Sequence, residues 1–192
     1  SNPLMKFFKK KLAVLLGIFV FFYILPLAIK PFVPKTLLVN KPGFSQAVYD
    51  KKGKLLRLFL SSDEKYRLWT EIEDISPSLI KTTLAQEDSW FYWHFGLNPV
   101  SVLRAAITSF TKKKNIGGST ITMQLARIRY GLYTRTISGK IKQILYATWL
   151  EYLFSKKDIL EAYLNMASYG GNIEGVGAAS LIYFKKEPKD LS

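Results

Sequence analysis

The pattern of apolar and polar positions divides the chain into three parts. Residues 12–29 contain no charged side chain, which is near the lower limit of length for a helix that crosses a membrane. Residues 47–60 read as two strands around Lys51-Lys52-Gly53, so they predict a β-hairpin, and residues 66–69 predict a third short strand. From Ser76 onward the apolar spacing is helical. We therefore expect a mainly α fold with a small N-terminal β element.

Capping residues mark where the helices should begin. Ser76-Pro77 and Asn98-Pro99 each place proline at a first helical position, and Ser155 is followed by an acid three residues later. The expected helices cover residues 76–93, 100–110, 137–154, 155–168 and 176–184. The apolar face of the 137–154 helix is expected at Ile141, Ile144, Leu145, Thr148 and Trp149. No strand is expected after the hairpin region.

The uncharged segment is interpreted as an uncleaved membrane anchor. Four lysines precede it, and positive charge keeps that side in the cytoplasm. A cleavable signal peptide is the alternative, but no clear small-x-small cleavage site follows. The expected division is a cytoplasmic basic tail at 1–11, a transmembrane anchor at 12–30, a linker with the small β element at 31–72, and a helical domain at 73–192.

The net charge and the absence of cysteine limit the classes of partner and of metal site that we expect for this chain. The formal net charge is +14, and after residue 30 there are still 23 basic against 14 acidic residues. A basic body indicates an anionic partner such as a nucleic acid, a phosphorylated ligand or a membrane surface. The anchor places the body outside the cytoplasm, which disfavours nucleic acid. The chain has no cysteine, so a disulfide framework and a thiolate metal site are both excluded.

Residues 86–96 hold the most distinctive candidate chemistry. Two adjacent carboxylates, Glu87 and Asp88, stand among aromatic residues and the chain's one histidine, His94. A carboxylate among aromatic side chains is partly desolvated, and its pKa then rises toward the range useful for proton transfer. The alternative is an aromatic helix end packed into a core, with its acids facing water. His94 alone cannot form a metal site.

A second candidate is the Gly-Gly-Ser-Thr segment at residues 117–120. Glycines before hydroxyl residues at a helix start suit close approach to an anion, because the first backbone N–H groups of a helix are unpaired. The same pattern also makes an ordinary loop and cap, and it lacks the lysine of a nucleotide-binding P-loop.

Taken together, these segments resemble the peptidoglycan glycosyltransferase domain of class A penicillin-binding proteins and monofunctional transglycosylases. The family's first motif, Glu-Asp-x-x-Phe-x-x-His-x-Gly, is matched in full at Glu87, Asp88, Phe91, His94 and Gly96. The second, Gly-Gly-Ser-Thr-Ile-Thr-Gln-Gln, is matched at 117–122 and Gln124. The fourth, Lys-x-x-Ile-Leu-Glu-x-Tyr-Leu-Asn, is matched at Lys156, Ile159, Leu160, Glu161, Tyr163, Leu164 and Asn165.

Three positions depart from the family pattern. The third motif is usually Arg-Lys-x-x-Glu, but this chain has Gly139 in place of the arginine and Gln143 in place of the glutamate. Met123 replaces one glutamine of the second motif. With these residues the chain is most similar to the 1C type of class A penicillin-binding protein.

The resemblance implies a lysozyme-like helical domain that polymerises lipid II into β-1,4-linked glycan strands with inversion. Glu87 would be the general base, and Gln143 would stand at the position of the second catalytic glutamate. Substrate binding would fall to Asp88, His94, Ser119, Thr120, Gln124, Arg127 and Lys140. A divalent cation such as Mg²⁺ or Mn²⁺ is also implied, although an amide at 143 cannot supply negative charge to it.

The implied partners are lipid II, glycan linked to polyprenyl diphosphate, the membrane, and other cell-wall synthesis proteins. The implied location is the bacterial inner membrane, with a single anchor and the catalytic domain on the periplasmic side.

Other functions stay open at this point. A lysozyme-like lytic enzyme also uses a helix-borne glutamate in a helical domain, and would release small soluble fragments from cell wall. A lipid II-binding scaffold without turnover is compatible with Gly139 and Gln143. A basic nucleic-acid binder is disfavoured by the anchor.

Overall fold

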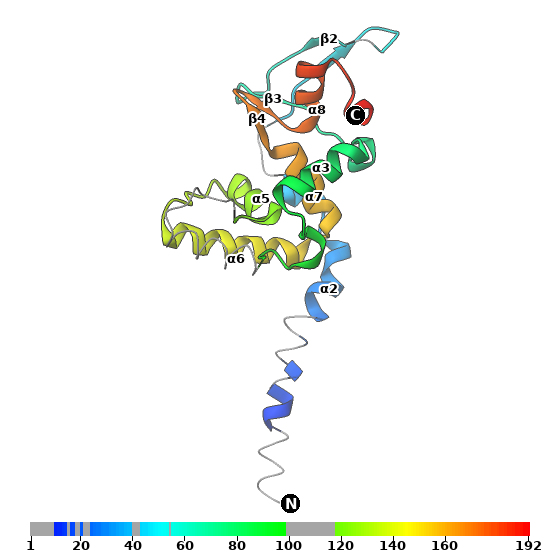
Figure 1. The fold of residues 1–192 in the computed structure, drawn as a ribbon. Helices are drawn as coiled ribbons and strands as arrows, with labels where there is room; N and C mark the ends of the chain where they lie inside the picture. The colour runs from blue at the N-terminus through cyan, green and yellow to red at the C-terminus, as the bar shows by residue number, and fades with distance from the viewer. Residues whose placement is uncertain are drawn as a thin grey trace, which may run out of the picture.

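The computed structural model describes residues 10–14, 16–17, 20, 24–39, 43–53, 55–98 and 118–192. Helices dominate these ranges, as expected from the apolar spacing (Figure 1). The α-helices are α2 (Leu25–Ile29), α3 (Pro77–Glu87), α5 (Ile121–Tyr130), α6 (Ile137–Leu153), α7 (Lys156–Met166) and α8 (Val176–Ala179). The expected helix at 100–110 and Gly117 lie outside the described residues.

Shorter helical turns connect these elements. The 3₁₀ turns are η2 (Lys30–Phe32), η3 (Lys35–Leu38), η4 (Ile72–Asp74), η5 (Phe91–Trp93) and η7 (Pro188–Asp190), and η6 (Ser180–Phe184) is a π-helical turn. Together α8 and η6 cover the helix expected at 176–184.

The core lies where α5, α6 and α7 meet. Helix α5 packs against both α6 and α7, and its buried side chains include Ile121, Met123 and Leu125. Helix α7 begins with the expected cap, since Ser155 and Asp158 form a complete capping box. All positions of α7 from Ile159 to Met166 are buried, so this helix is the centre of the domain.

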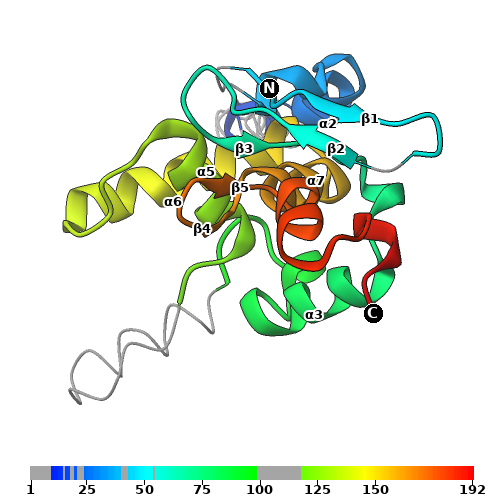
Figure 2. The same cartoon turned by 90° about the horizontal axis from the view of Figure 1, so that it is seen from above.

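Two small sheets lie at the end of the domain opposite α6 (Figure 1), and Figure 2 shows their strands from above. The expected hairpin is present, with β1 (Ala47–Tyr49) antiparallel to β2 (Leu55–Leu58). The second sheet has the order β3-β5-β4, built from β3 (Tyr66–Arg67), β4 (Ser168–Gly170) and β5 (Ile173–Glu174). Strand β3 is parallel to β5, and β4 is antiparallel to it.

This second sheet corrects the sequence prediction in two respects. The strand expected at 66–69 exists, but it pairs with β5 rather than with the hairpin. The region after the hairpin is not all helical, because β4 and β5 follow α7 in a segment where no strand had been expected. The reason is long-range: the buried Arg67 guanidinium donates to Glu174 at 2.7 and 3.0 Å and to Asp63 at 3.0 and 3.3 Å. That ion-pair cluster joins β3 to β5.

The expected helix at 76–93 is shorter than the pattern indicated. Helix α3 ends at Glu87, and Asp88 leaves helical geometry with φ −163° and ψ 75°. Residues Phe91–Trp93 form the separate turn η5. Asp88 points instead toward His94 and the start of α5, so these side-chain hydrogen bonds end the helix six residues before the expected end at residue 93.

The apolar positions expected to form one face of α6 are only partly buried: Ile144 packs against the core and Thr148 is half-buried. Ile141, Leu145 and Trp149 are 53%, 64% and 54% exposed. The side that faces the core carries Gly139, Gln143, Ala147, Leu150 and Glu151. Two polar residues belong to this buried side because they hydrogen-bond across the core, as described below.

The N-terminal segment leaves the domain on the side of α6, and α2 packs against α6 (Figure 1). Within the described ranges, which contain gaps between residues 14 and 24, no helix is long and apolar enough to cross a membrane.

Candidate active site

Glu87 stands at the last position of α3 with its carboxylate exposed. Its Oε2 accepts a hydrogen bond of 2.8 Å from Nε2 of Gln124. Among the described residues, the aromatic side chains of this segment do not enclose the carboxylate as expected, because Trp90, Tyr92 and Trp93 are 61%, 59% and 85% exposed. The carboxylate is therefore accessible to a substrate hydroxyl, and its nearest organising partner is an amide rather than a ring.

Asp88 and His94 form a buried pair next to this carboxylate. The Asp88 oxygens lie 2.8 and 3.0 Å from His94 Nε2. The Asp88 carboxylate also accepts the backbone N–H of Ile121 at 3.0 Å, at the first residue of α5. A carboxylate at a helix N-terminus is favoured by the unpaired N–H groups there. The pair orders the start of α5 against the end of α3, in keeping with a supporting role.

Thr120 also holds the start of α5 against the loop that follows η5. Its hydroxyl donates to the Gly96 carbonyl at 2.7 Å and accepts the Met123 N–H at 3.1 Å, which caps α5. Gly96 has φ +77°, and a Cβ there would lie 3.1 Å from the Ala147 backbone. Glycine is required because the loop after η5 passes directly over α6.

Lys140 forms the cationic side of the site. Its Nζ donates to Ser119 Oγ at 2.7 Å and to Gln143 Oε1 at 2.8 Å. The pKa of Lys140 lies below its ordinary value, first because the ammonium is partly buried and second because Arg127 is nearby and positive. Both named partners of the ammonium are neutral, so its charge stays available to an anionic ligand.

Both polar atoms of the Gln143 side chain are hydrogen-bonded to neighbouring residues. Its side chain is 2% exposed, its Oε1 accepts from Lys140, and its Nε2 donates to the Met123 carbonyl at 2.7 Å. Two departures from the family pattern, Met123 and Gln143, are thus in direct contact. The third, Gly139, has its own steric cause: a Cβ there would lie 1.9 Å from the Tyr133 carbonyl oxygen.

The predicted site residues come together around the first half of α5. Glu87 is joined to Gln124, while the neighbouring Met123 carbonyl is joined through Gln143 and Lys140 to Ser119. Arg127 follows one turn later on α5 and is exposed. One carboxylate and two cations therefore share this surface, an arrangement suited to deprotonating a hydroxyl beside an anionic leaving group.

Sequence reasoning missed a buried polar cluster beneath the site. Lys156 Nζ donates to the His94 carbonyl and to Glu151 Oε1, both at 2.7 Å, and Thr122 donates to the same Glu151 oxygen at 2.6 Å. The available signal was Glu151, the one charged residue in the otherwise uncharged segment 144–154, because a charged residue is almost never fully buried without a partner.

Two matched residues of the fourth motif are structural. Asn165 exchanges hydrogen bonds of 2.7 Å with both the N–H and the carbonyl of Thr70. Glu161 Oε2 accepts the Ile72 N–H at 3.0 Å, and burial raises the pKa of this carboxyl. These bonds attach the segment before η4 to α7.

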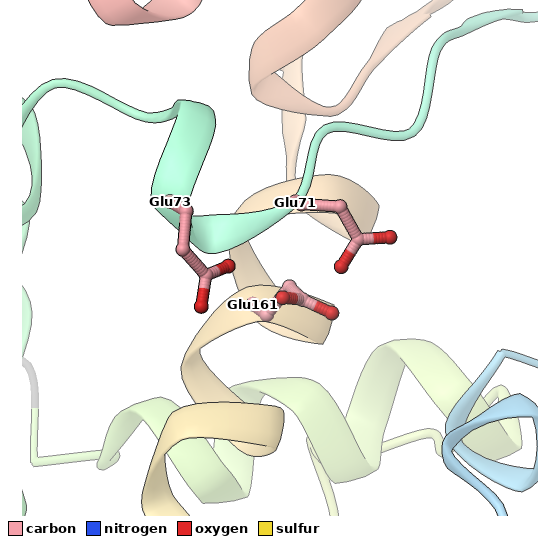
Figure 3. A group of neighbouring side chains, drawn as sticks. All are labelled: Glu71, Glu73 and Glu161. Atoms are coloured by element: carbon pink, nitrogen blue, oxygen red, sulfur yellow. The ribbon is translucent and has the colours of Figure 1, made fainter.

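One group of acids among the described residues has the spacing of a metal site. Glu71, Glu73 and Glu161 bring carboxylate oxygens within 4.8 Å of one another (Figure 3). Glu73 is paired with Lys157, and Lys35 lies 3.9 Å from Glu161. The two lysines offset part of this negative charge. Since none of the three acids belongs to the predicted catalytic set, we interpret the cluster as a junction between the linker and α7.

Comparison with known proteins gives one consistent result. Residues 52–192 match the family model described as transglycosylase. The chain is 42% identical to penicillin-binding protein 1C of Escherichia coli over 77% of this chain and 19% of that protein. It is 39% identical to penicillin-binding protein 1A of Aquifex aeolicus over 83% of this chain and 22% of that protein.

A shorter relative is covered more fully. The chain is 35% identical to the biosynthetic peptidoglycan transglycosylase of Pasteurella multocida over 96% of this chain and 72% of that protein. Against the penicillin-binding proteins named above, the chain spans only about a fifth of their length.

Proposed function

This chain belongs to the transglycosylase family, and from that premise we propose that it polymerises lipid II into peptidoglycan glycan strands. The observation that carries the proposal is the placement of one accessible carboxylate, Glu87, and the cations Lys140 and Arg127 around α5. Burial and then the charge of Glu87 raise the pKa of Tyr163, and the charge of Arg127 opposes this rise. Glu87 and Arg127 therefore both lie near this tyrosine.

In the proposed reaction, the donor is a glycan on polyprenyl diphosphate and the acceptor is the sugar 4-hydroxyl of lipid II. Glu87 accepts the hydroxyl proton as the oxygen attacks the anomeric carbon from the face opposite the diphosphate. The new C–O bond forms with inversion, and the bond from the anomeric carbon to the phosphate oxygen breaks with its electron pair leaving on the diphosphate. A positioned general base typically contributes about 10²–10⁴ in rate.

The leaving diphosphate gains negative charge, so the site needs donors aimed at that charge. Lys140 and Arg127 supply two positive charges, and Ser119 supplies a hydroxyl already in contact with Lys140. Gln143 keeps the ammonium in place without neutralising it, because its amide oxygen accepts a hydrogen bond but carries no net charge.

The described residues around Lys140 do not fit a divalent cation. Mg²⁺ binds carboxylates and retains several waters, whereas this donor set consists of an ammonium, a guanidinium nearby, a hydroxyl and an amide whose two polar atoms are both occupied. We therefore propose that turnover here depends little on Mg²⁺ or Mn²⁺, with Lys140 and Arg127 providing the positive charge.

The exposed side of α6 supports a location at a membrane. Ile137, Ile141, Leu145 and Trp149 repeat at intervals of four residues and are all more than half exposed, so they form one apolar stripe. Helix α2, at the end of the uncharged N-terminal segment, packs against the same helix. Large contiguous apolar patches mark interaction surfaces. In this proposal residues 12–30 anchor the chain in the inner membrane, and the domain lies on the periplasmic side, where both lipid substrates present their head groups.

The test is polymerisation of labelled lipid II in detergent by the purified chain and by Glu87→Gln. We expect polymer from the parent and none from the variant. Release of small soluble fragments from purified cell wall would instead identify a lytic enzyme. Binding of a lipid II analogue without turnover, in a folded parent, would identify a scaffold.

A further inference from the structure

Tyr163 is a buried tyrosine on α7 that is connected to Glu87 by two hydrogen bonds through the side chain of Gln124. Only 7% of the residue is exposed. Its hydroxyl donates to Oε1 of Gln124 across a long contact of 3.3 Å, and Gln124 Nε2 in turn donates to Glu87 Oε2 at 2.8 Å. The three side chains come from α7, α5 and α3, so this relay is made only in the folded domain.

The direction of each hydrogen bond in the relay is fixed by chemistry. An ionised carboxylate only accepts, so the Gln124 amide must present its NH₂ group to Glu87 and its oxygen to Tyr163. The Tyr163 hydroxyl meets that oxygen as a donor. Burial, and after it the charge of Glu87, raises the pKa of Tyr163 far above its ordinary value, so the hydroxyl keeps its proton throughout any working pH range.

We propose that Tyr163 is a positioning residue for the general base and acts by fixing the amide orientation of Gln124. This inference rests on the proposed function of Glu87. With the amide fixed, Oε2 of Glu87 is held by an N–H donor. Among the described residues Oε1 has no hydrogen-bond partner, so it is the oxygen that receives the substrate proton.

Without the tyrosine hydroxyl, the amide of Gln124 loses the donor that selects one of its two orientations. The reversed orientation places the amide oxygen against the carboxylate, where two acceptors repel each other. The charged form of Glu87 is then less favoured, and protonation should begin at higher pH. The acidic limb of the activity profile should therefore move upward.

The experiment compares Tyr163→Phe with the parent and with Tyr66→Phe. Phenylalanine keeps the ring and removes the hydroxyl alone. Tyr66 is a matched control because it packs in the separate cluster of Ile173, Ala178 and Ala179. Lipid II polymerisation is measured across pH, with kcat and KM separated. Since one hydrogen bond contributes roughly 0.5–1.5 kcal/mol, we expect about a 2- to 12-fold fall in kcat near the acidic limb and an upward shift of about 0.5–1 pH unit.

A second measurement does not depend on activity. The side-chain carboxyl of Glu87 is followed by ¹³C NMR through a pH titration and assigned with Glu87→Gln. Its midpoint should rise in Tyr163→Phe and in Gln124→Leu, with no further rise in the double variant, because both substitutions remove the same relay. Tyr66→Phe should titrate as the parent does.

Each outcome decides one of the two proposals. An equal loss of activity at every pH with an unmoved titration midpoint would assign Tyr163 a packing role and overturn the inference. An unchanged profile would overturn it as well. An inactive parent whose midpoint still shifts in both variants would reject the proposed function and retain the relay. If Tyr163→Phe does not fold, Gln124→Leu alone tests the relay, and an unmoved midpoint there contradicts it.

Discussion

Replacing Gln143 by glutamate restores the acid of the family motif and tests how the cationic side of the site is built. In the parent, Gln143 accepts from Lys140 at 2.8 Å and donates to the Met123 carbonyl at 2.7 Å. A carboxylate keeps the first contact as an ion pair. It loses the second, because it has no N–H and would face the carbonyl oxygen.

The stability change should be small because large terms oppose each other. An ion pair at this distance gains about 6 kcal/mol at an effective dielectric constant near 20. Desolvating the buried carboxylate costs several kcal/mol. The lost hydrogen bond to the Met123 carbonyl, which keeps its helical N–H partner within α5, costs about 0.5–1.5 kcal/mol. We therefore expect Gln143→Glu to fold, with a free energy of unfolding within about 2 kcal/mol of the parent.

Ligand binding should also change. An ammonium shared with a carboxylate loses much of its interaction with a phosphate, and a hydrogen bond to a charged group contributes about 1.5–3 kcal/mol. This corresponds to binding that is about 10- to 150-fold weaker. A divalent cation placed between the new carboxylate and the diphosphate should recover the loss.

The assay is calorimetric titration of geranyl diphosphate, a short polyprenyl diphosphate, with a chelator and with excess Mg²⁺. The parent should give the same Kd for geranyl diphosphate with chelator and with Mg²⁺. Gln143→Glu should bind weakly with chelator and regain affinity with Mg²⁺. Gln46→Glu makes the same amide-to-acid change at an exposed position of the hairpin region and serves as the control. Tight binding by Gln143→Glu in chelator, or a parent that requires Mg²⁺, would refute the reasoning.

Three further predictions follow. Because burial and then Arg127 lower the pKa of Lys140, its ammonium deprotonates below the ordinary value of 10.5; diphosphate affinity should fall as pH rises through that window, and Lys140→Arg should remove the fall. Gly139→Ala should lose about 1–3 kcal/mol in urea unfolding, because its Cβ would overlap the Tyr133 carbonyl; unchanged stability would contradict the close contact. Leu145→Ser should keep stability within about 0.5 kcal/mol and weaken binding to phosphatidylglycerol vesicles in flotation; unaltered flotation would argue against the α6 stripe as a membrane surface.

Local signals in the sequence determined much of the secondary structure. The hairpin at 47–60 and the helices over 137–153 and 156–166 follow from turn residues, apolar spacing and caps that act within a few residues of themselves. The Ser155 capping box is the clearest case, because both of its partners lie within one turn. The site residues were found differently: their identities came from motif resemblance, which fixes positions along the chain but not their surroundings.

Tertiary structure decided which of these residues face solvent, which face the core and which meet. Helix α6 carries apolar residues on more than one side, so its spacing could not show that Gln143 and Glu151 turn inward while Leu145 and Trp149 turn out. The β3-β5 pairing depends on Arg67 meeting Glu174, and the relay to Glu87 depends on Tyr163 meeting Gln124. Residues so far apart in the chain leave no local periodic signal, because their hydrogen bonds form only after the helices have packed.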